Sequence, residues 1–175
     1  MSRKKKIILL LDLVGIIILI LIDQYTKYLA VIRLKDKAAF NIINGVLEFN
    51  YLENKGAAFG MLQNQKVFFI FVAIVILSVI AYVLFKTPDK RKYTVLHVLL
   101  SLIAAGAIGN MIDRIRYDYV VDFIYFVLIN FPIFNVADIY VSVSTVVLVI
   151  LLLFYYKEDD LNFISFKQKR YREIK

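Results

Sequence analysis

The stretch IILLLDLVGIIILILIDQYTKYL, residues 7–29, carries only three charged side chains: Asp12, Asp23 and Lys27. An apolar run of about 18 residues or more is long enough to cross the roughly 30 Å hydrocarbon core as a helix. Basic residues precede the run at positions 3–6, as in a secretory signal, but no small-residue cleavage site follows it. We therefore predict an uncleaved first membrane span.

Three further apolar runs have the length of membrane spans, at about 67–85, 94–113 and 136–156. The 175-residue chain is 61% hydrophobic with a mean hydropathy of +0.73, which is more apolar material than a soluble domain of this size buries. The sequence predicts an all-α membrane protein with four transmembrane helices. Residues 1–157 would form a single membrane domain, and residues 158–175 a cytoplasmic basic tail.

The net charge of +8 is concentrated in three segments: the N-terminus, residues 86–92 and the tail from residue 157. The positive-inside rule assigns such segments to the cytoplasm, so the charge is expected to set topology, and we expect no nucleic acid partner. Both termini would be cytoplasmic. The segments 30–66 and 114–135 would then lie on the outer face, and connections of this length are commonly functional.

The first outer segment contains a strand pattern. Residues 47–51 (LEFNY) alternate apolar and polar side chains after the turn signal Asn44-Gly45, which is the period of a half-buried strand. We expect a small extracytoplasmic β-sheet and loop region on the membrane surface. A glycine-containing loop, Asn54–Gly60, follows and leads into the second span.

Ionisable residues at or inside the predicted membrane boundary are costly to bury and are therefore functional candidates. They are Asp12, Asp23, Lys27, His97, Asp113, Arg114, Asp122 and Asp138. Asp23 and Lys27 are spaced i, i+4, which favours a helical ion pair, and either residue could also hold substrate or a lipid headgroup. Asp12 lies near the inner boundary, where we expect a local contact rather than catalysis.

Asp113 and Arg114 end the third span. Adjacent side chains on a helix point about 100° apart, so we expect each to pair with another segment rather than with its neighbour. The guanidinium fork of Arg114 suits the orientation of a carboxylate or a peptide.

Asp122 and Asp138 flank the second outer connection. Asp122 stands in the β-branched and aromatic run Val120–Ile124, where a buried carboxylate requires a partner or a raised pKa. Asp138 follows Asn135 by three residues where the fourth span begins, so it can complete a capping box or act as a catalytic acid. The residues alone leave both roles open.

The composition limits the chemistry available on the outer face. The chain has no cysteine, and its single histidine, His97, lies near the inner end of the third span, which excludes cysteine–histidine and serine–histidine catalysis on that face. A serine–lysine pair, Ser142 or Ser144 with Lys27, and a metal site built only of aspartates stay open without support from any local motif. Two carboxylates that share one proton can hydrolyse a peptide bond with water alone.

Five motifs together resemble those of the lipoprotein signal peptidase family, the type II signal peptidases, over residues 12–156. They are DQYTK (23–27), NKGAAFG (54–60), GNMIDR (109–114), VVDFI (120–124) and FNVAD (134–138). Any one motif is weak, but all five in this order are specific. In one departure, Tyr125 stands where the family often has a second acid.

The resemblance implies that Asp122 and Asp138 are the catalytic pair. It also implies supporting or substrate-binding roles for Asp23, Lys27, Asn54, Gly56, Asn110, Arg114, Asn135 and Ala137. The family's activity would make the chain an aspartic endopeptidase that removes the signal peptide from diacylglyceryl-modified prolipoproteins before the lipidated cysteine, at the outer face of the bacterial cytoplasmic membrane. Its partners would be these substrates and membrane lipids, with no cofactor and no metal.

Three other interpretations stay open. An unrelated intramembrane aspartic protease would not require a lipid on its substrate. A small transporter or channel would use Asp12, Asp23 and Asp138 along an ion path, and a non-enzymatic assembly factor would tolerate Asp122→Asn. The phenylalanines within residues 68–71 are expected to face lipid or the membrane interface.

Overall fold

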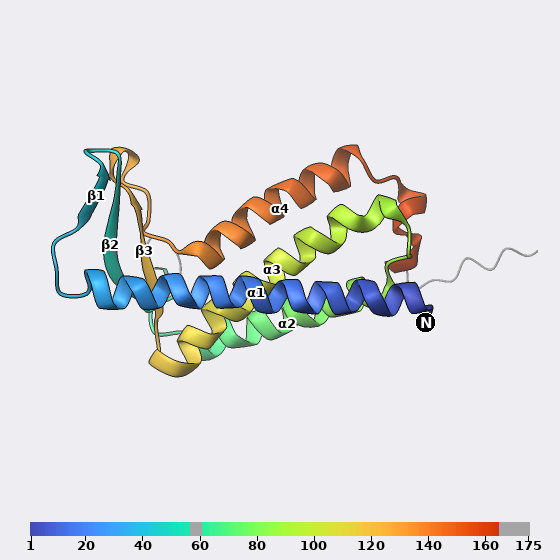
Figure 1. Cartoon of the computed structure of the whole chain (residues 1–175), viewed down its shortest axis with the longest axis horizontal. Coiled ribbons are helices and arrows are strands. Elements are labelled where there is room, and N and C mark those ends of the chain that lie inside the picture. Colours follow the sequence, from blue (N-terminus) through green and yellow to red (C-terminus); the bar gives the residue numbers. More distant parts are fainter. Residues whose placement is uncertain (57–60, 165–175) are drawn as a thin grey trace, which may run out of the picture.

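The computed structural model describes residues 1–56 and 61–164, and these residues form four long helices and a three-stranded sheet (Figure 1). The long helices are α1 (Arg3–Leu34), α2 (Lys66–Lys86), α3 (Thr94–Tyr117) and α4 (Val136–Phe154), and the strands are β1 (Phe40–Ile43), β2 (Leu47–Asn54) and β3 (Val120–Phe126). Short 3-10 turns are η2 (Arg91–Tyr93), η3 (Val127–Ile129) and η4 (Glu158–Ile164). All four long helices, α3 together with η2, have the length and apolar composition of membrane spans. The predicted fold class is confirmed.

The central helix is α3, which packs against each of the other three. The outward faces of α1, α2 and α4 expose many large apolar side chains, as lipid-facing helices do. Because lipid is itself apolar, helix association in a membrane depends on close packing of small residues. A Cβ atom added to Gly106 of α3 would lie 2.5 Å from the carbonyl oxygen of Ala137, so α4 approaches this closely because position 106 has no side chain.

The sheet lies at the end of the bundle opposite the N-terminus (Figure 1). Its strands are antiparallel in the order β1–β2–β3, and Gly45, with φ of +71°, forms the predicted turn between the first two. Phe123 of β3 packs with Ala30 of α1 and with Phe49 of β2, which fixes the sheet to the first helix. The predicted small sheet is confirmed, although the sequence pattern indicated only β2.

Two helices, α1 and α3, extend by several residues beyond the apolar runs that predicted them. α1 begins at Arg3, where the Ser2 side chain accepts a hydrogen bond from the Lys5 N–H as an N-cap. α3 continues through Arg114 to Tyr117 and ends at Asp118, whose φ is +67°. Hydropathy marks only the part of a helix that crosses hydrocarbon, whereas capping decides where the helix itself stops. The extension of α3 includes Arg114, which lies just beyond the apolar run.

The other end of the bundle is closed by the segment that follows α4. Phe163 of η4 packs on Tyr93, whose ring stacks against that of Tyr156. Asp160 forms an ion pair with Lys92. The first part of the predicted tail, residues 158–164, thus packs on the helix bundle, and residues 165–175 lie outside the described residues.

Candidate active site

Asp122 lies in β3 opposite Leu52 of β2, and only 1% of it is exposed. Its Oδ2 accepts a hydrogen bond from the Asn54 side-chain amide at 2.8 Å, and its Oδ1 accepts one from the Asn135 amide at 2.6 Å. Burial and, second, the negative charge of Asp138 raise the pKa of Asp122 to about 7, because removal from water disfavours the charged carboxylate. This buried carboxylate therefore has both partners and a raised pKa.

Asp138 is the third residue of α4 and completes a capping box with Asn135. The Asn135 side-chain oxygen accepts from the Asp138 backbone N–H at 3.0 Å, and Asp138 Oδ2 accepts from the Asn135 backbone N–H at 3.1 Å. The other carboxylate oxygen, Oδ1, accepts from the Asn110 amide at 2.8 Å. Capping is thus one role of Asp138, and the same bonds hold its carboxylate at a fixed place in the site.

Two asparagines connect the carboxylates. The Asn135 amide that bonds Asp122 also donates to Asn110 Oδ1 at 3.1 Å, and Asn110 in turn donates to Asp138. Lys27 Nζ donates to the same Asn110 oxygen at 2.8 Å. Because this oxygen accepts from two donors, the Asn110 amide nitrogen is left to face Asp138. The two carboxylates are therefore held by groups from α3, from the N-cap of α4 and from the sheet.

A buried ionic cluster of Asp23, Lys27 and Asp113 lies behind these asparagines. Lys27 Nζ is 3.0 Å from Asp23 Oδ2 and 3.0 Å from Asp113 Oδ2, and all three side chains are at most 3% exposed. Asp23 Oδ1 accepts from the Ala137 N–H, and Asp113 Oδ2 accepts from the Val121 N–H. The predicted i, i+4 pair is present, but it is not self-contained: it shares Lys27 with a second acid, and both acids bind the backbone of the candidate site.

Arg114 contacts a peptide group and an aromatic ring. Its Nη2 donates to the Gly56 carbonyl at 3.2 Å, and its Cζ lies 4.4 Å from the centre of the Phe69 ring. Gly56 N–H donates to the side chain of Asn54, so Arg114 supports the loop that carries a partner of Asp122. Phe69 thus contacts a residue of the candidate site, and nothing in the sequence separates it from the phenylalanines beside it.

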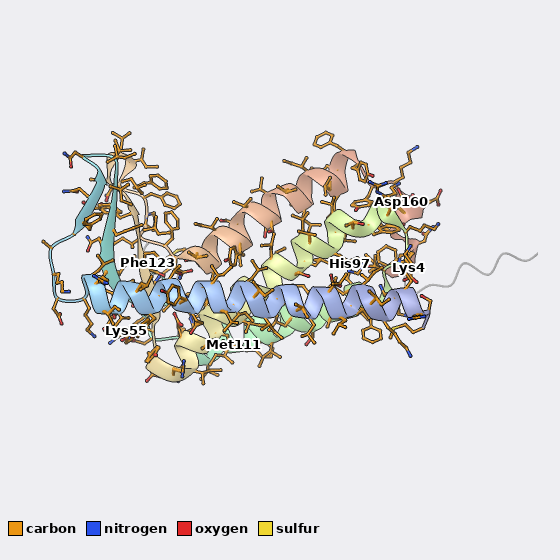
Figure 2. The ribbon with its side chains drawn as sticks, in the orientation of Figure 1. Lys4, Lys55, His97, Met111, Phe123 and Asp160 are labelled. Atoms are coloured by element: carbon orange, nitrogen blue, oxygen red, sulfur yellow. The ribbon has the colours of Figure 1, made fainter. Side chains whose placement is uncertain are left out.

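These residues line a cleft of about 590 Å³ among α2, α3, α4 and the connection between β3 and α4. Its polar lining includes Asn54, Asn110, Arg114, Asp122 and Asp138, and its apolar lining includes Val72, Ile76, Phe131, Ile133 and Val141. A few convergent polar groups in a mostly apolar cleft are typical of a ligand-binding site. Figure 2 places Phe123, on the same strand as Asp122, at the sheet end of the bundle.

Several residues considered from sequence lie outside this arrangement. Asp12 pairs with His97 at 2.7 Å toward the opposite end of the bundle. Ser142 donates to the Asp138 carbonyl, and Lys27 is occupied by the ionic cluster and Asn110, so no serine–lysine pair forms among the described residues. Within residues 1–56 and 61–164 no three histidine, aspartate or glutamate side chains are placed to hold a metal ion. Residues 57–60 of the predicted loop lie outside the described residues.

The fold is that of an integral membrane enzyme. Two solved structures of bacterial membrane enzymes are similar to it. One is 31% identical with a TM-score of 0.73, and the match covers 90% of this chain and 93% of that one. The other is 33% identical with a TM-score of 0.71, and the match covers 83% of this chain and 94% of that one. The sequence profile of the signal peptidase (SPase) II family, Peptidase_A8, matches residues 15–154. The chain belongs to this family.

Curated relatives agree with this assignment. The lipoprotein signal peptidase of Clostridium tetani is 41% identical over 142 residues, which cover 79% of this chain and 90% of the relative. That of Caldanaerobacter subterraneus subsp. tengcongensis is 44% identical over 130 residues, covering 74% and 86%. The suspected family resemblance is confirmed.

Proposed function

We propose that the chain is an aspartic endopeptidase that removes the signal peptide from diacylglyceryl-modified prolipoproteins and cuts before the lipidated cysteine. Membership in the signal peptidase II family and the names of the curated relatives support the general activity. The aspartic mechanism rests on one observation: two carboxylates, Asp122 and Asp138, line one cleft and are joined through Asn135.

In the proposed reaction the two carboxylates share one proton. Asp122, whose pKa is raised to about 7, holds the proton at rest, and Asp138 at the start of α4 acts as the base. Asp138 takes a proton from water as the water oxygen attacks the scissile carbonyl carbon, and Asp122 donates its proton to the carbonyl oxygen. The tetrahedral intermediate collapses as one of its hydroxyls returns a proton to Asp122 and the C–N bond breaks, and the amine leaves with the proton that Asp138 received.

The supporting residues have distinct proposed roles. Asn54, Asn110 and Asn135 orient the carboxylates, and Arg114 fixes the loop at Gly56. Asp23 and Lys27 act from behind the site, because Asp23 holds the backbone of Ala137 at the start of α4. These are positioning roles, and none of them requires contact with substrate.

The apolar wall of the cleft suits a lipidated substrate. Val72 and Ile76 of α2 and Val141 of α4 line it together with the carboxylates. A cysteine that carries two acyl chains is anchored in the bilayer, so its neighbouring peptide bond arrives at the membrane surface. A cleft with apolar walls between helices and polar groups near the sheet can hold the acyl chains and the peptide bond at the same time.

We also propose the topology and domain organisation predicted from charge. Residues 1–157 form one membrane domain, residues 158–175 a cytoplasmic tail, and both termini are cytoplasmic, with the site at the outer face. In support, the described residues put the N-terminus and η4 at one end of the bundle and the sheet at the other (Figure 1). The basic segments 3–6 and 86–92 flank the first of these ends.

The test compares wild type with Asp122→Asn and Asp138→Asn at matched levels in membranes. Each protein receives a diacylglyceryl-modified prolipoprotein or its unlipidated form, and the product mass is measured. Asp118→Asn is the matched control, because Asp118 is an exposed acid at the sheet end of α3 that pairs with Lys66. We expect Asp118→Asn to cut at the wild-type rate and each site variant to lose about 10²-fold or more, the usual contribution of acid–base catalysis.

The outcomes separate the alternatives. Wild-type cleavage by either site variant would refute the aspartic pair. Equal cleavage of the unlipidated precursor would indicate a general intramembrane peptidase instead, and a product that retains residues before the lipidated cysteine would refute the proposed cleavage position.

A further inference from the structure

Phe69 of α2 differs from the phenylalanines on either side of it. Phe68 and Phe71 are 47% and 64% exposed, as lipid-facing side chains are, whereas Phe69 is half-buried and lines the candidate active-site cleft. The centre of its ring lies 4.4 Å from Arg114 Cζ, within the range of about 6 Å over which an aromatic face attracts a cation. Phe69 stands outside the five motifs, and the proposed reaction gives it no role.

The Phe69 ring compensates the charge of Arg114. A guanidinium has five N–H donors, and those of Arg114 donate to two backbone carbonyls, of Asn110 at 3.4 Å and of Gly56 at 3.2 Å. Within residues 1–56 and 61–164 Arg114 forms no ion pair. Besides the two carbonyl dipoles, the negative face of the Phe69 ring is therefore the group that offsets this half-buried positive charge.

The position of Arg114 reaches Asp122 through the loop at Gly56. The Gly56 carbonyl accepts from Arg114, and the Gly56 N–H donates to Asn54 Oδ1 at 3.0 Å. The Asn54 amide in turn donates to Asp122 Oδ2 at 2.8 Å. A side chain at position 56 would overlap the Met61 carbonyl oxygen, so the loop is held there through its backbone. Arg114 thus supports a partner of the candidate catalytic carboxylate.

An aromatic ring suits this position better than an acid would. Asp138 and Asp122 attract the Arg114 guanidinium, although neither forms an ion pair with it in the described part of the chain. A third carboxylate near these two would add like charge, which opposes their ionisation. Phe69 holds the cation without adding charge or a competing hydrogen-bond group. Without the ring, the guanidinium would be free to turn from Gly56 toward the two carboxylates.

We propose that Phe69 is a positioning residue for peptide hydrolysis. The face of its ring holds the Arg114 guanidinium at the Gly56 carbonyl, and the loop at Gly56 then keeps Asn54 in place on Asp122. Phe69 acts through Arg114 and needs no contact with substrate. This role rests on the proposed aspartic mechanism. It differs from simple packing because it requires the electrons of the ring and not only its shape.

Fluorinated phenylalanines test the ring at nearly constant shape. Phenylalanine with one, two or three ring fluorines is incorporated at position 69 of the full chain, and each fluorine weakens the attraction of the ring face for a cation. With the diacylglyceryl-modified prolipoprotein, kcat should fall stepwise, by about fivefold at three fluorines, the strength of a partly exposed cation–π contact. KM should stay near the wild-type value. The same series at Phe71 is the matched control, because Phe71 is exposed and does not line the cleft, and it should leave kcat unchanged.

Arg114→Gln removes the cation and tests whether the ring acts through it. Thermal unfolding in detergent does not depend on activity, and three fluorines at position 69 should lower the unfolding temperature more in the wild-type background than in Arg114→Gln. Equal effects in both backgrounds, or an unchanged kcat across the series, would overturn the proposal. A rise in KM alone would overturn it too, because Phe69 would then be part of the wall that contacts substrate. A wild type that does not cut the lipidated precursor would instead refute the proposed function, and the role of Phe69 with it.

Discussion

At the scale of single residues, Asn135 is the side chain that connects the two carboxylates of the site. Its side chain caps α4 through the Asp138 N–H and donates to Asp122, while its backbone N–H donates to the Asp138 carboxylate. An asparagine is suited to this position because it offers an acceptor for the cap and donors for a carboxylate on one side chain. The sequence indicated that Asn135 caps α4. Its hydrogen bond to Asp122, which lies 13 residues earlier on β3, depends on tertiary packing.

Substitution of Asn135 separates its two roles. Asn135→Ser keeps an N-cap but removes the amide donor from the Asp122 carboxylate, and an unpaired buried acceptor costs about 1–3 kcal/mol. We expect kcat/KM to fall about 10- to 100-fold and the thermal unfolding temperature to fall by the amount that this cost implies, about 2–4 °C for each kcal/mol. Asn135→Asp keeps the cap as well but sets a second carboxylate against Asp122, so it should be the less active variant. If Asn135→Asp is as active as wild type, the amide of Asn135 does not orient Asp122.

The pKa of Asp122 gives a pH dependence with a definite sign. Burial, followed by the charge of Asp138, raises this pKa from 3.8 to about 7, and the proposed reaction needs Asp122 protonated. The rate of cleavage should therefore fall as the pH rises through about 7. A pH series of kcat/KM on the lipidated substrate in detergent measures it. A rate that increases between pH 6 and 8 would contradict the assignment of the proton to Asp122.

The same shift predicts how stability varies with pH. The folded pKa of Asp122 lies above its unfolded value, so the folded state binds the extra proton between about pH 4 and 7. This contribution to stability is fully present below about pH 4, decreases as the pH rises toward 7, and is absent above it. Thermal unfolding of wild type against Asp122→Asn should show a pH-dependent difference confined to this window.

At the scale of elements, α3 connects the site to the rest of the bundle. Asp113 of this helix and Asp23 of α1 share Lys27, and Gly109 allows their close approach, because a Cβ there would lie 2.5 Å from Asp23 Oδ2. Asp23 and Asp113 then bind backbone groups at the start of α4 and in β3. The ionic cluster thus sets the relative positions of the two elements that carry the candidate catalytic acids.

Removing the shared cation should be far more damaging than removing an exposed one. Lys27→Met leaves two buried acids without their partner, and loss of one member of a buried ion pair costs about 3–5 kcal/mol. Lys35→Met is the control: it also breaks an ion pair with an acid, Glu53, but 40% of the Lys35 side chain is exposed, and such pairs contribute about 1 kcal/mol at most. Unfolding in mixed detergent micelles measures both, and similar losses would mean that the buried cluster is not stabilising.

At the scale of the whole molecule, hydropathy made the four helices predictable because crossing hydrocarbon demands long apolar runs whatever the tertiary contacts. The place of Asp122 and Asp138 at the membrane boundary marked them as candidates, but only motifs that resemble a family joined them into one candidate site. The partnership of Lys27 with Asp113 links residues 86 positions apart and leaves no local pattern. β3 carried a β-branched and aromatic run, yet its place beside β2 and the contact between Phe69 and Arg114 follow from packing alone.

The orientation of the molecule in the membrane can be tested because the chain has no cysteine, so any cysteine introduced is unique. Asn41 on β1 and Arg91 in η2 are both exposed and lie at opposite ends of the bundle. With basic segments held in the cytoplasm, Asn41→Cys should react with a membrane-impermeant maleimide in intact spheroplasts, and Arg91→Cys only after lysis. Reaction of Arg91→Cys first would place the sheet and its cleft in the cytoplasm, where a lipoprotein precursor exposed at the outer surface could not reach them.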